Sequence, residues 1–352
     1  MFYIAGIVVL RVYFSTANLC FFRMKKVLGL GNALTDILMQ VSDADIKALG
    51  VSKGSMNHIT LEQSFDIQHH FSSTRKSMIA GGSASNTINA IASLGGQAAF
   101  IGKLGHDEIG EFFRQDTLRN GVRPLFLNSE LPSGHCTVLI TPDGERTFCT
   151  YLGASGDIRE ENITPDMFLG FDIFHIEGYL VQNHALIEKA VRQAKEMGLQ
   201  VSFDMSSFNV INENKEFIDS LVRQYVDIVF ANEDEALAYT NLAPEPALDM
   251  LADICDTAVV KIGKRGSLVR HGAEKYLVPA ICTNCVDSTG AGDYYAAGFL
   301  FGLACNLDLH SCAEIGTLTA GRVCEVVGAK LSDDTWTEVR GLVALIQSEE
   351  RW

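Results

Sequence analysis

The segment with the clearest chemical content is "DSTGAGD", residues 287 to 293. Gly290 and Gly292 allow close backbone approach, and the free amides and dipole of a following helix favour an anion. Four residues on one stripe predict that helix: Tyr294, Ala297, Gly298 and Phe301. Asp293 would repel an anion unless it takes a proton from an attacking hydroxyl, as in phosphoryl transfer. The alternative, an N-cap in a tight turn, explains Asp293 about as well.

Two further segments place polar side chains beside sharp turns. In "GLGNALTD", Asn32 and Asp36 follow the first predicted strand, where they could fork onto vicinal hydroxyls. An Asx turn with a helix cap is the alternative there. In "GGSASN", Gly81 and Gly82 permit close backbone approach and Asn86 stands at the head of a helix. Both segments are candidates for contact with a small polar ligand.

Two segments in the C-terminal half are candidates for the phosphate side of a site. "ANEDEA" ends a strand with Asn232 and Glu235, which suit ordering water or Mg²⁺ near phosphate oxygens. Its alternative is a helix start enriched in acidic residues. "KIGKRGSLV" supplies Gly263 and Gly266 as a ledge for phosphate or purine, although a plain hairpin turn explains them almost as well.

The elements around these segments alternate between strands and helices. Hydrophobic patterns predict strands over 26–31, 98–105, 172–178, 199–205, 226–232 and 256–263, and helices over 86–95, 107–121 and 183–198. Such alternation implies an α/β fold with a mostly parallel sheet that is covered on both faces. Ligands of these folds bind at the carboxyl ends of the strands.

One stretch breaks this alternation. Residues 134–153, "GHCTVLITPDGERTFCTYLG", predict a hairpin around Pro-Asp-Gly with no helix attached. Because an isolated hairpin is not stable in water, it must pack on something or cover something. With the irregular segment after the first strand, it could form a small sheet over the site. We therefore expect a lid made from about residues 38–60 and 122–152.

Composition limits the remaining possibilities. The 352 residues carry 28 basic and 43 acidic side chains, a net charge of −15, which argues against a nucleic-acid or anionic membrane surface. The nine cysteines suggest reduced thiols in a cytoplasmic protein, and the single C-x-x-C, Cys282 and Cys285, has no second pair for zinc. Residues 1–23 are interpreted as an apolar extension outside the fold, with a membrane anchor as the alternative.

Together these motifs resemble the ribokinase-like sugar and nucleoside kinase (PfkB) family, over about residues 26–332. The resemblance implies a three-layer α/β/α sandwich with a small β lid in residues 24–352, ATP as donor and Mg²⁺ as cofactor. It implies Asp293 as base and Gly290, Ala291 and Gly292 as anion hole. It also implies acceptor contacts from Asn32, Asp36, Gly81, Gly82 and Asn86, and Mg²⁺, phosphate and nucleotide contacts from Asn232, Glu235, Gly263, Gly266 and Thr289. Ser288 stands where the family usually has threonine. A K⁺ site near Asp287, Thr289 and Ser332, as in some relatives, is a hypothesis here.

The identity of the acceptor is the open question. "GNALTD", "FANEDEA" and "DGERTFCTYLGAS" resemble the adenosine-kinase-like branch, in which the lid arginine, here Arg146, faces the phosphates. A base needs an apolar sandwich, for which Phe148, Tyr151, Tyr179 and Phe208 are candidates, although core packing explains each of them. We favour a ribonucleoside, adenosine first, over a free sugar such as ribose or fructose.

Other protein classes fit less well. A non-catalytic sugar or nucleoside sensor on the same fold would be expected to lack Asp293, which is present. A nicotinamide oxidoreductase is disfavoured because Leu34 replaces the third glycine of its motif, and no P-loop sequence occurs. The expected partner is therefore a small-molecule substrate, with no nucleic acid and no membrane, and the protein is expected to be a monomer or a homodimer.

Overall fold

The computed structural model describes residues 23–281 and 283–349, and its centre is a nine-stranded sheet. From one edge to the other, its strands are β14 (Glu274–Val278), β13 (Ser267–His271), β12 (Thr257–Lys261), β11 (Ile228–Asn232), β10 (Gln200–Asp204), β9 (Ile173–Glu177), β1 (Lys26–Leu30), β5 (Gln97–Gly105) and β6 (Arg123–Ser129). Neighbouring strands from β12 to β6 are parallel, whereas β13 and β14 pair antiparallel. The predicted mostly parallel sheet is confirmed.

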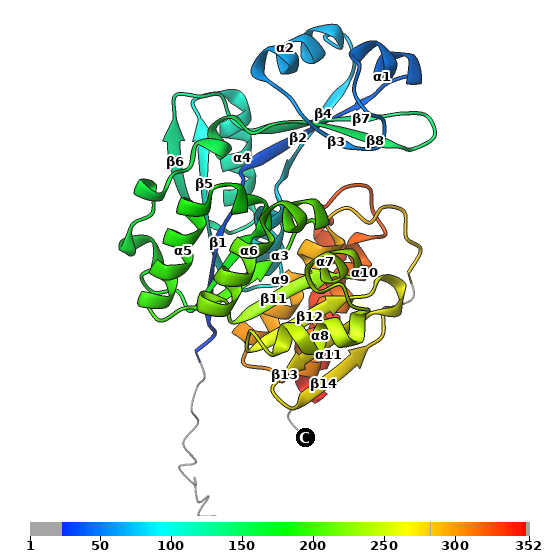
Figure 1. The fold of residues 1–352 in the computed structure, drawn as a ribbon. Coiled ribbons are helices and arrows are strands. Elements are labelled where there is room, and N and C mark those ends of the chain that lie inside the picture. Colours follow the sequence, from blue (N-terminus) through cyan, green and yellow to red (C-terminus); the bar gives the residue numbers. More distant parts are fainter. Residues whose placement is uncertain (1–22, 282, 350–352) are drawn as a thin grey trace, which may run out of the picture.

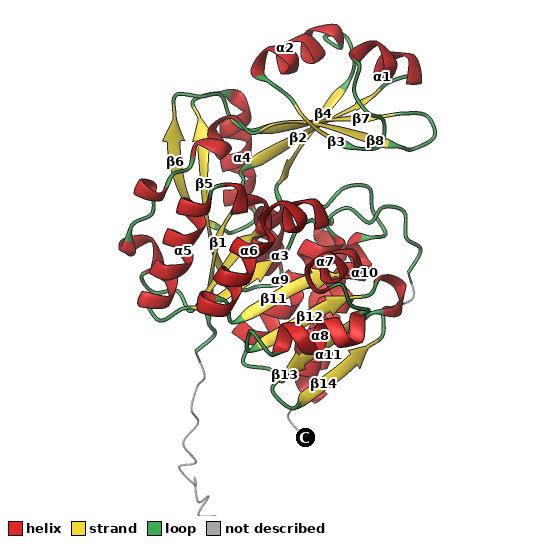
Figure 2. Cartoon of the chain, viewed as in Figure 1, coloured by secondary structure: helices red, strands yellow, loops and turns green. Residues whose placement is uncertain are grey.

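Helices cover both faces of this sheet, because its strands are apolar on both sides (Figures 1 and 2). One core lies under α5 (His184–Glu196), α6 (Phe208–Tyr225), α7 (Glu233–Thr240) and α8 (Pro244–Ala252). The other lies under α3 (Ser83–Ser93), α4 (Glu108–Arg119), α9 (Ala291–Ala304), α10 (Leu309–Val323) and α11 (Asp333–Glu349). Short 3₁₀ turns are η1 (Gly153–Asp157), η2 (Glu160–Asn162), η3 (Pro165–Phe168), η4 (Gly178–Gln182) and η5 (Gly263–Arg265). The result is the expected three-layer sandwich.

A second, five-stranded sheet forms the lid. Its order is β3 (Met56–His58), β8 (Arg146–Tyr151), β7 (His135–Ile140), β2 (Leu34–Gln40) and β4 (Lys76–Gly81). Helices α1 (Asp43–Leu49) and α2 (Leu61–His70) cover the face that points away from the large domain (Figure 1). Together they bury a small core of their own, so the predicted hairpin β7–β8 does not stand alone.

The lid differs from the expected segments in two places. Strand β6, within the expected segment 122–152, belongs to the large sheet because it pairs in parallel with β5. The first expected segment is longer than 38–60, since β2 and β4 pair with each other and bring residues 34–81 into the lid. This antiparallel pairing joins strands that are far apart in sequence, which local hydrophobic patterns do not register.

The ends of the chain are described only in part. Most of the predicted extension, residues 1–22, and Cys282 of the C-x-x-C lie outside the described residues. Arg23 is described and forms an ion pair of 2.9 Å with Asp172 just before β9. Within residues 23–281 and 283–349, no helix is both long and apolar enough to cross a membrane.

Candidate active site

Helix α9 begins inside the "DSTGAGD" segment, at the carboxyl-end side of the large sheet. Gly290 is its N-cap residue, with φ of +77° and no capping side chain. A β-carbon there would lie 2.5 Å from the Ala329 side chain, so only glycine fits. The first amides of α9 are consequently left without a side-chain cap, as an anion site requires. Asp293 lies in the first turn and not at the cap, which excludes its interpretation as an N-cap.

The carboxylate of Asp293 is held by helix α3. The Ser83 hydroxyl donates to Oδ1 at 2.7 Å, and the Asn86 amide donates to Oδ2 at 2.9 Å. Burial raises the pKa of Asp293 to about 7, although the bonds from Asn86 and Ser83 oppose the rise. A carboxylate that titrates near neutrality is suited to accept a proton from a hydroxyl. Asn86, expected to contact the acceptor, thus contacts the candidate base directly.

Sequence reasoning missed a buried carboxylate that joins the two N-terminal turns. Glu177, at the end of β9, accepts hydrogen bonds from the Asn32 backbone at 2.9 Å and from the Asn32 amide side chain at 2.7 Å. Its other oxygen accepts the backbone N–H of Ala84 at 2.8 Å. Burial raises the pKa of Glu177, against the lowering effect of these three bonds. Glu177 therefore fixes the turn after β1 against the start of α3.

The remaining residues of these turns come together beside the lid. Asp36, on lid strand β2, is so close to Gly81 that a β-carbon on this glycine would be 2.7 Å from the Asp36 carboxylate. Gly82 has φ of +88°, and a β-carbon there would be 2.2 Å from the Asn32 carbonyl oxygen. Burial raises the pKa of Asp36 to about 7, opposed by Arg146. These predicted acceptor contacts are therefore neighbours in space.

Asn232 and Glu235 form a capping box at the start of α7. The Asn232 backbone and side-chain amides donate to Glu235 at 2.7 Å each, and the Glu235 N–H donates back to Asn232 Oδ1 at 2.8 Å. Burial raises the pKa of Glu235 to about 7. Both carboxylate oxygens of Glu235 accept one of these hydrogen bonds, and each keeps a further lone pair for a water or another ligand. No cluster of three or more His, Cys, Asp or Glu suited to a metal occurs in the described part of the chain.

Sequence reasoning also missed a buried ion pair between the last residues of β10 and β12, the two strands that flank β11. Lys261, the last residue of β12, donates to Asp204, the last residue of β10, at 3.0 Å. A β-carbon on Gly292 would lie 3.1 Å from the Lys261 ammonium nitrogen. The cation is therefore beside Gly292, in the segment of residues 287–293, which we call the anion loop. A charged residue that ends an apolar strand was the available sequence signal, and it applies to Glu177, Asp204 and Lys261 alike.

Arg146 connects the lid to the anion loop. Its guanidinium forms an ion pair of 2.7 Å with Oδ2 of Asp287, which also accepts the N–H of Gly328 at 2.7 Å. Asp287 Oδ1 accepts the backbone N–H and the hydroxyl of Thr289 at 3.0 and 2.8 Å. These contacts use both carboxylate oxygens of Asp287, one of the residues hypothesised to hold K⁺. Ser332 is exposed and hydrogen-bonds Thr335 at the start of α11.

The remaining candidates are placed as follows. Gly263 and Gly266 lie in the turn between the antiparallel strands β12 and β13, so the hairpin alternative describes their geometry. Tyr179 follows β9 and donates its hydroxyl to Ser206 O at 3.2 Å. Desolvation and, after it, the charge of Asp293 raise the pKa of Tyr179, although the residue is 37% exposed. Two other aromatic candidates are half-buried on lid strand β8, Phe148 and Tyr151, and the fourth, Phe208, is exposed at the start of α6.

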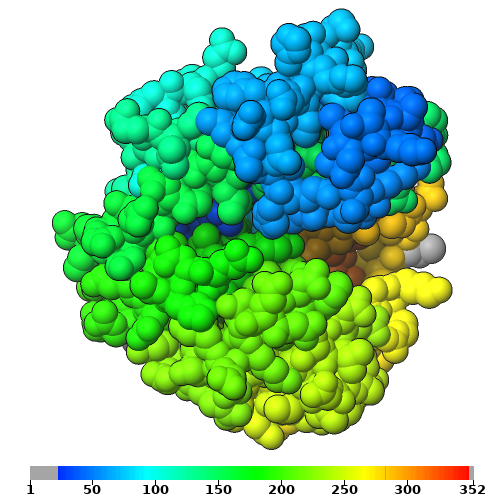
Figure 3. Space-filling view, turned by 45° about the horizontal axis from the view of Figure 1, so that its top comes forward, coloured from blue at the N-terminus to red at the C-terminus, as the bar shows by residue number. Residues whose placement is uncertain are grey.

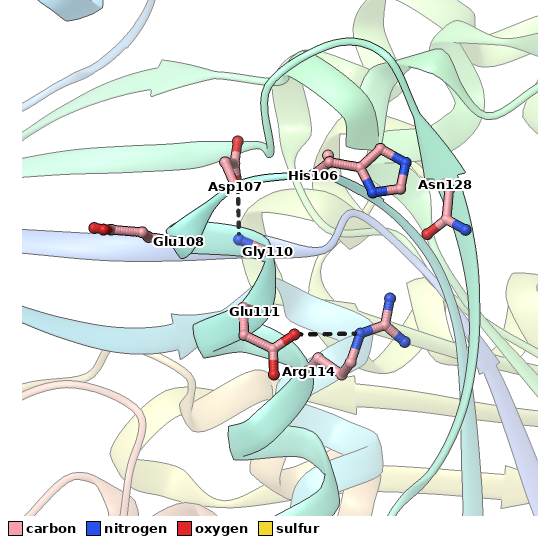
Figure 4. A pocket seen from close by; sticks show the side chains of 8 residues that line it. His106, Asp107, Glu108, Gly110, Glu111, Arg114 and Asn128 are labelled. Atoms are coloured by element: carbon pink, nitrogen blue, oxygen red, sulfur yellow. Dashed lines mark hydrogen bonds and ion pairs between the residues drawn. The ribbon is translucent and has the colours of Figure 1, made fainter.

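The space between the lid and the large domain is open to solvent. Figure 3 shows this hollow below the blue lid, with orange atoms of the C-terminal segment at its bottom. A separate hollow of about 510 Å³ lies at the end of β5 and the start of α4, beside His106, Asp107 and Arg114 (Figure 4). Its Glu111 pairs with Arg114 and its Asp107 caps α4, so these side chains serve the surrounding structure.

Comparison with known proteins identifies the family of the chain. A model of the pfkB family carbohydrate kinases matches residues 51–336. The chain belongs to the pfkB family. The structure of adenosine kinase from Sinorhizobium meliloti matches with a TM-score of 0.81 and 35% identity, over 91% of this chain and 99% of that one. A probable sugar kinase from Rhizobium etli CFN 42 matches with a TM-score of 0.81 and 31% identity, over 92% and 99%.

Sequence comparison gives the same family. The aminoimidazole riboside kinase of Salmonella typhimurium is 31% identical over 237 residues, which are 64% of this chain and 73% of that protein. As a pfkB family member with the ribokinase-like fold, the protein is a phosphotransferase that acts on a hydroxyl of a sugar or nucleoside. The resemblance stated from the motifs is thereby confirmed, and so is the adenosine-kinase-like likeness.

Proposed function

We propose that this pfkB kinase transfers the γ-phosphoryl group of ATP to the primary hydroxyl of a ribonucleoside, adenosine first, with Asp293 as general base. The observation that supports it best is the position of Asp293. Its carboxylate lies one residue beyond the uncapped amides of α9 and is held by Ser83 and Asn86. A base and an anion site are thus adjacent on one turn, as in-line transfer from a hydroxyl requires.

The residues of the chain divide the work of this reaction. Asp293 accepts the proton of the acceptor hydroxyl, while the amides of Gly290, Ala291 and Gly292 stabilise the charge that develops on the phosphoryl oxygens. Asn232 and Glu235 would hold a hydrated Mg²⁺, which supplies positive charge to the phosphate oxygens when bound. Asn32, Asp36 and the turn at Gly81 and Gly82 would orient the hydroxyls of the acceptor beside Asp293.

The lid completes the site in this proposal. Arg146 reaches from β8 to the anion loop, so a closed lid places a cation beside the phosphates and excludes water. The nucleoside preference is supported by the likeness to adenosine kinase and by the exposed Tyr179, on which a base could stack. A free sugar such as ribose or fructose is the second candidate, favoured by the likeness to the Rhizobium etli probable sugar kinase.

The test is ADP release from ATP and Mg²⁺ across adenosine, guanosine, inosine, cytidine, ribose, fructose and 2-deoxyribose, with Asp293→Asn alongside. We expect turnover with one nucleoside that the variant loses, while the variant still binds the acceptor. Turnover with free sugars alone would keep the mechanism and reject the nucleoside. An equal loss of binding and turnover in Asp293→Asn would reject Asp293 as the base.

A further inference from the structure

The ammonium of Lys261 occupies a position beside the anion loop that the proposed mechanism has not used. Lys261 is the last residue of β12, and its side chain is 14% exposed. Its ammonium nitrogen would be 3.1 Å from a β-carbon on Gly292. Burying a lysine costs free energy unless its charge is compensated. Its location next to an amide of the anion hole therefore calls for a functional explanation.

The aspartate that pairs with Lys261 is itself held firmly. Asp204 Oδ2 accepts from Lys261 at 3.0 Å, and Oδ1 accepts the backbone N–H of Ser206 at 2.8 Å. Ser206 adopts φ of +61°, a left-handed conformation that costs a non-glycine residue about 1–2 kcal/mol. Its hydroxyl oxygen also accepts the N–H of Gly178 at 2.8 Å, which helps to impose this conformation. A strained residue thus fixes the carboxylate that aims the lysine.

The charges around Lys261 explain why a phosphate would need it. Burial lowers its pKa, but Asp204, Glu235 and Asp293 raise it more, so the group stays an ammonium. These three carboxylates face the same end of the sheet and would repel a polyphosphate. Arg146 is already paired with Asp287, at the start of the anion loop. Lys261 is therefore placed to offset the negative charge where Gly292 meets the transferred group.

We propose that Lys261 is a catalytic residue that binds the oxygens of the transferred phosphoryl group, and that Asp204 is a positioning residue that aims its ammonium. This assignment rests on the proposed function. In the step, the bond from the γ-phosphorus to the acceptor oxygen forms as the bond to the β,γ-bridging oxygen breaks. The acceptor proton goes to Asp293, and ADP leaves with the electron pair of the broken bond. Lys261 remains protonated throughout and loses no atom.

The first experiment compares the full-length protein with Lys261→Met and with the control Lys275→Met. Lys275 is also paired with an aspartate, Asp249 at 2.8 Å, but it lies on the edge strand β14. Removing one stabilising donor from such a site typically lowers kcat by about 100- to 1,000-fold, so we expect this for Lys261→Met, with KM of the acceptor within about threefold. The control should retain the activity of the parent protein. A kcat of Lys261→Met within about threefold of the parent would overturn the proposal.

The second experiment does not depend on turnover. Calorimetry measures binding of ADP and of the non-hydrolysable β,γ-imido analogue of ATP, both with Mg²⁺. Losing a charge-assisted bond to the γ-phosphoryl should weaken binding of the triphosphate analogue by roughly ten- to a hundredfold, while ADP binding changes little. Equal effects on both nucleotides would overturn the proposal. If the parent phosphorylates none of the acceptors, the proposed function fails, and this comparison still decides the role of Lys261.

A double variant separates catalysis from structure. Lys261→Met leaves Asp204 buried and unpaired, which should lower the melting temperature. Lys261→Met with Asp204→Asn removes that unpaired charge, so stability should recover toward the parent value. We expect kcat and triphosphate affinity to stay low in the double variant. Recovery of both together with stability would show that Lys261 serves the fold alone.

Discussion

The buried carboxylate of Asp293 should make the protein less stable above neutral pH, and Asp293→Asn should remove that penalty. Burial raises the pKa of Asp293 from its ordinary value of 3.8 to about 7. Such a rise corresponds to at most about 4 kcal/mol of unfolding free energy when both states are ionised. Asparagine has no charge to bury, so the variant should be the more stable protein at alkaline pH while it loses phosphoryl transfer.

The sign follows from which state holds the proton. Below pH about 4 the carboxyl is protonated in both the folded and the unfolded chain, so it contributes no difference. Between about 4 and 7 the folded protein keeps a proton that the unfolded chain releases, so stability falls as pH rises. Above about 7 the full penalty is present. The hydrogen bonds are preserved in the variant, because the Ser83 hydroxyl can donate to the new amide oxygen and the Asn86 amide can rotate to accept.

The assay is urea unfolding of the parent and Asp293→Asn at pH 5.5 and pH 8.5. The stability difference in favour of the variant should widen by about 2 kcal/mol across this range. Asp107→Asn is the control. Although burial opposes it, bonds from the N–H groups of Ser133 and Gly110 lower the pKa of Asp107, so its titration falls below this range. That variant keeps an oxygen that caps α4 but sets an NH₂ group against the N–H of Ser133, so its loss of stability should be equal at both pH values. Parallel pH profiles for the parent and Asp293→Asn would refute the desolvation argument.

Three other predictions concern the residues that hold the site together. Glu177→Gln removes a charged acceptor of three N–H groups, so the free energy of unfolding should fall by about 2–3 kcal/mol and the melting temperature should drop. The KM of the acceptor should rise. If the melting temperature and KM are both unchanged, Glu177 does not tether the two turns. Gly82→Ala should lower the free energy of unfolding in urea by about 1–3 kcal/mol, because its β-carbon would be 2.2 Å from the Asn32 carbonyl oxygen at φ of +88°. The control Gly341→Ala should not destabilise the protein, since a β-carbon there meets nothing within 4 Å. Because Arg146 already neutralises Asp287, exchanging KCl for NaCl should leave kcat unchanged within about twofold, and Arg146→Met should lower kcat in either salt. Activation by K⁺ and not by Na⁺ would contradict this prediction and favour the K⁺ site hypothesised from the sequence.

The parts of the site that the sequence predicts are those encoded within one short segment. The anion loop, the turn at Gly81 and Gly82, and the pair Asn232 and Glu235 each lie in a few consecutive residues with glycine or capping signals. Glu177, Asp204 and Lys261 were missed because each ends an apolar strand and finds its partner elsewhere in the chain. The contact from Asn32 to Glu177 spans 145 positions and that from Lys261 to Asp204 spans 57. Only the order of the strands in the sheet brings such residues together.

The strands of the large sheet were predicted well for a similar reason. Continuous apolar runs bounded by turn residues identify buried strands locally, and β1, β5, β9, β10, β11 and β12 all fall where such runs were found. The lid was predicted less well, because β2 and β4 are partly exposed and each pairs with a distant strand. Strand β6 was assigned to the lid because it adjoins the hairpin in sequence, but its hydrogen bonds are made with β5.

The chain enters the lid directly after Asn32 and leaves it through Gly81 and Gly82. The chain also enters the lid between β6 and β7 and leaves it after β8, so two of the four connections between the lid and the large domain are the segments that would contact the acceptor. Glu177 ties both of these segments to the end of β9. A molecule bound there would contact two of these connections at once. Acceptor affinity and lid position would thus be coupled: an acceptor that binds the closed lid more tightly than the open lid shifts the lid toward closure. A substitution that favours the closed lid should tighten binding of that acceptor, by at most the ratio of its two affinities.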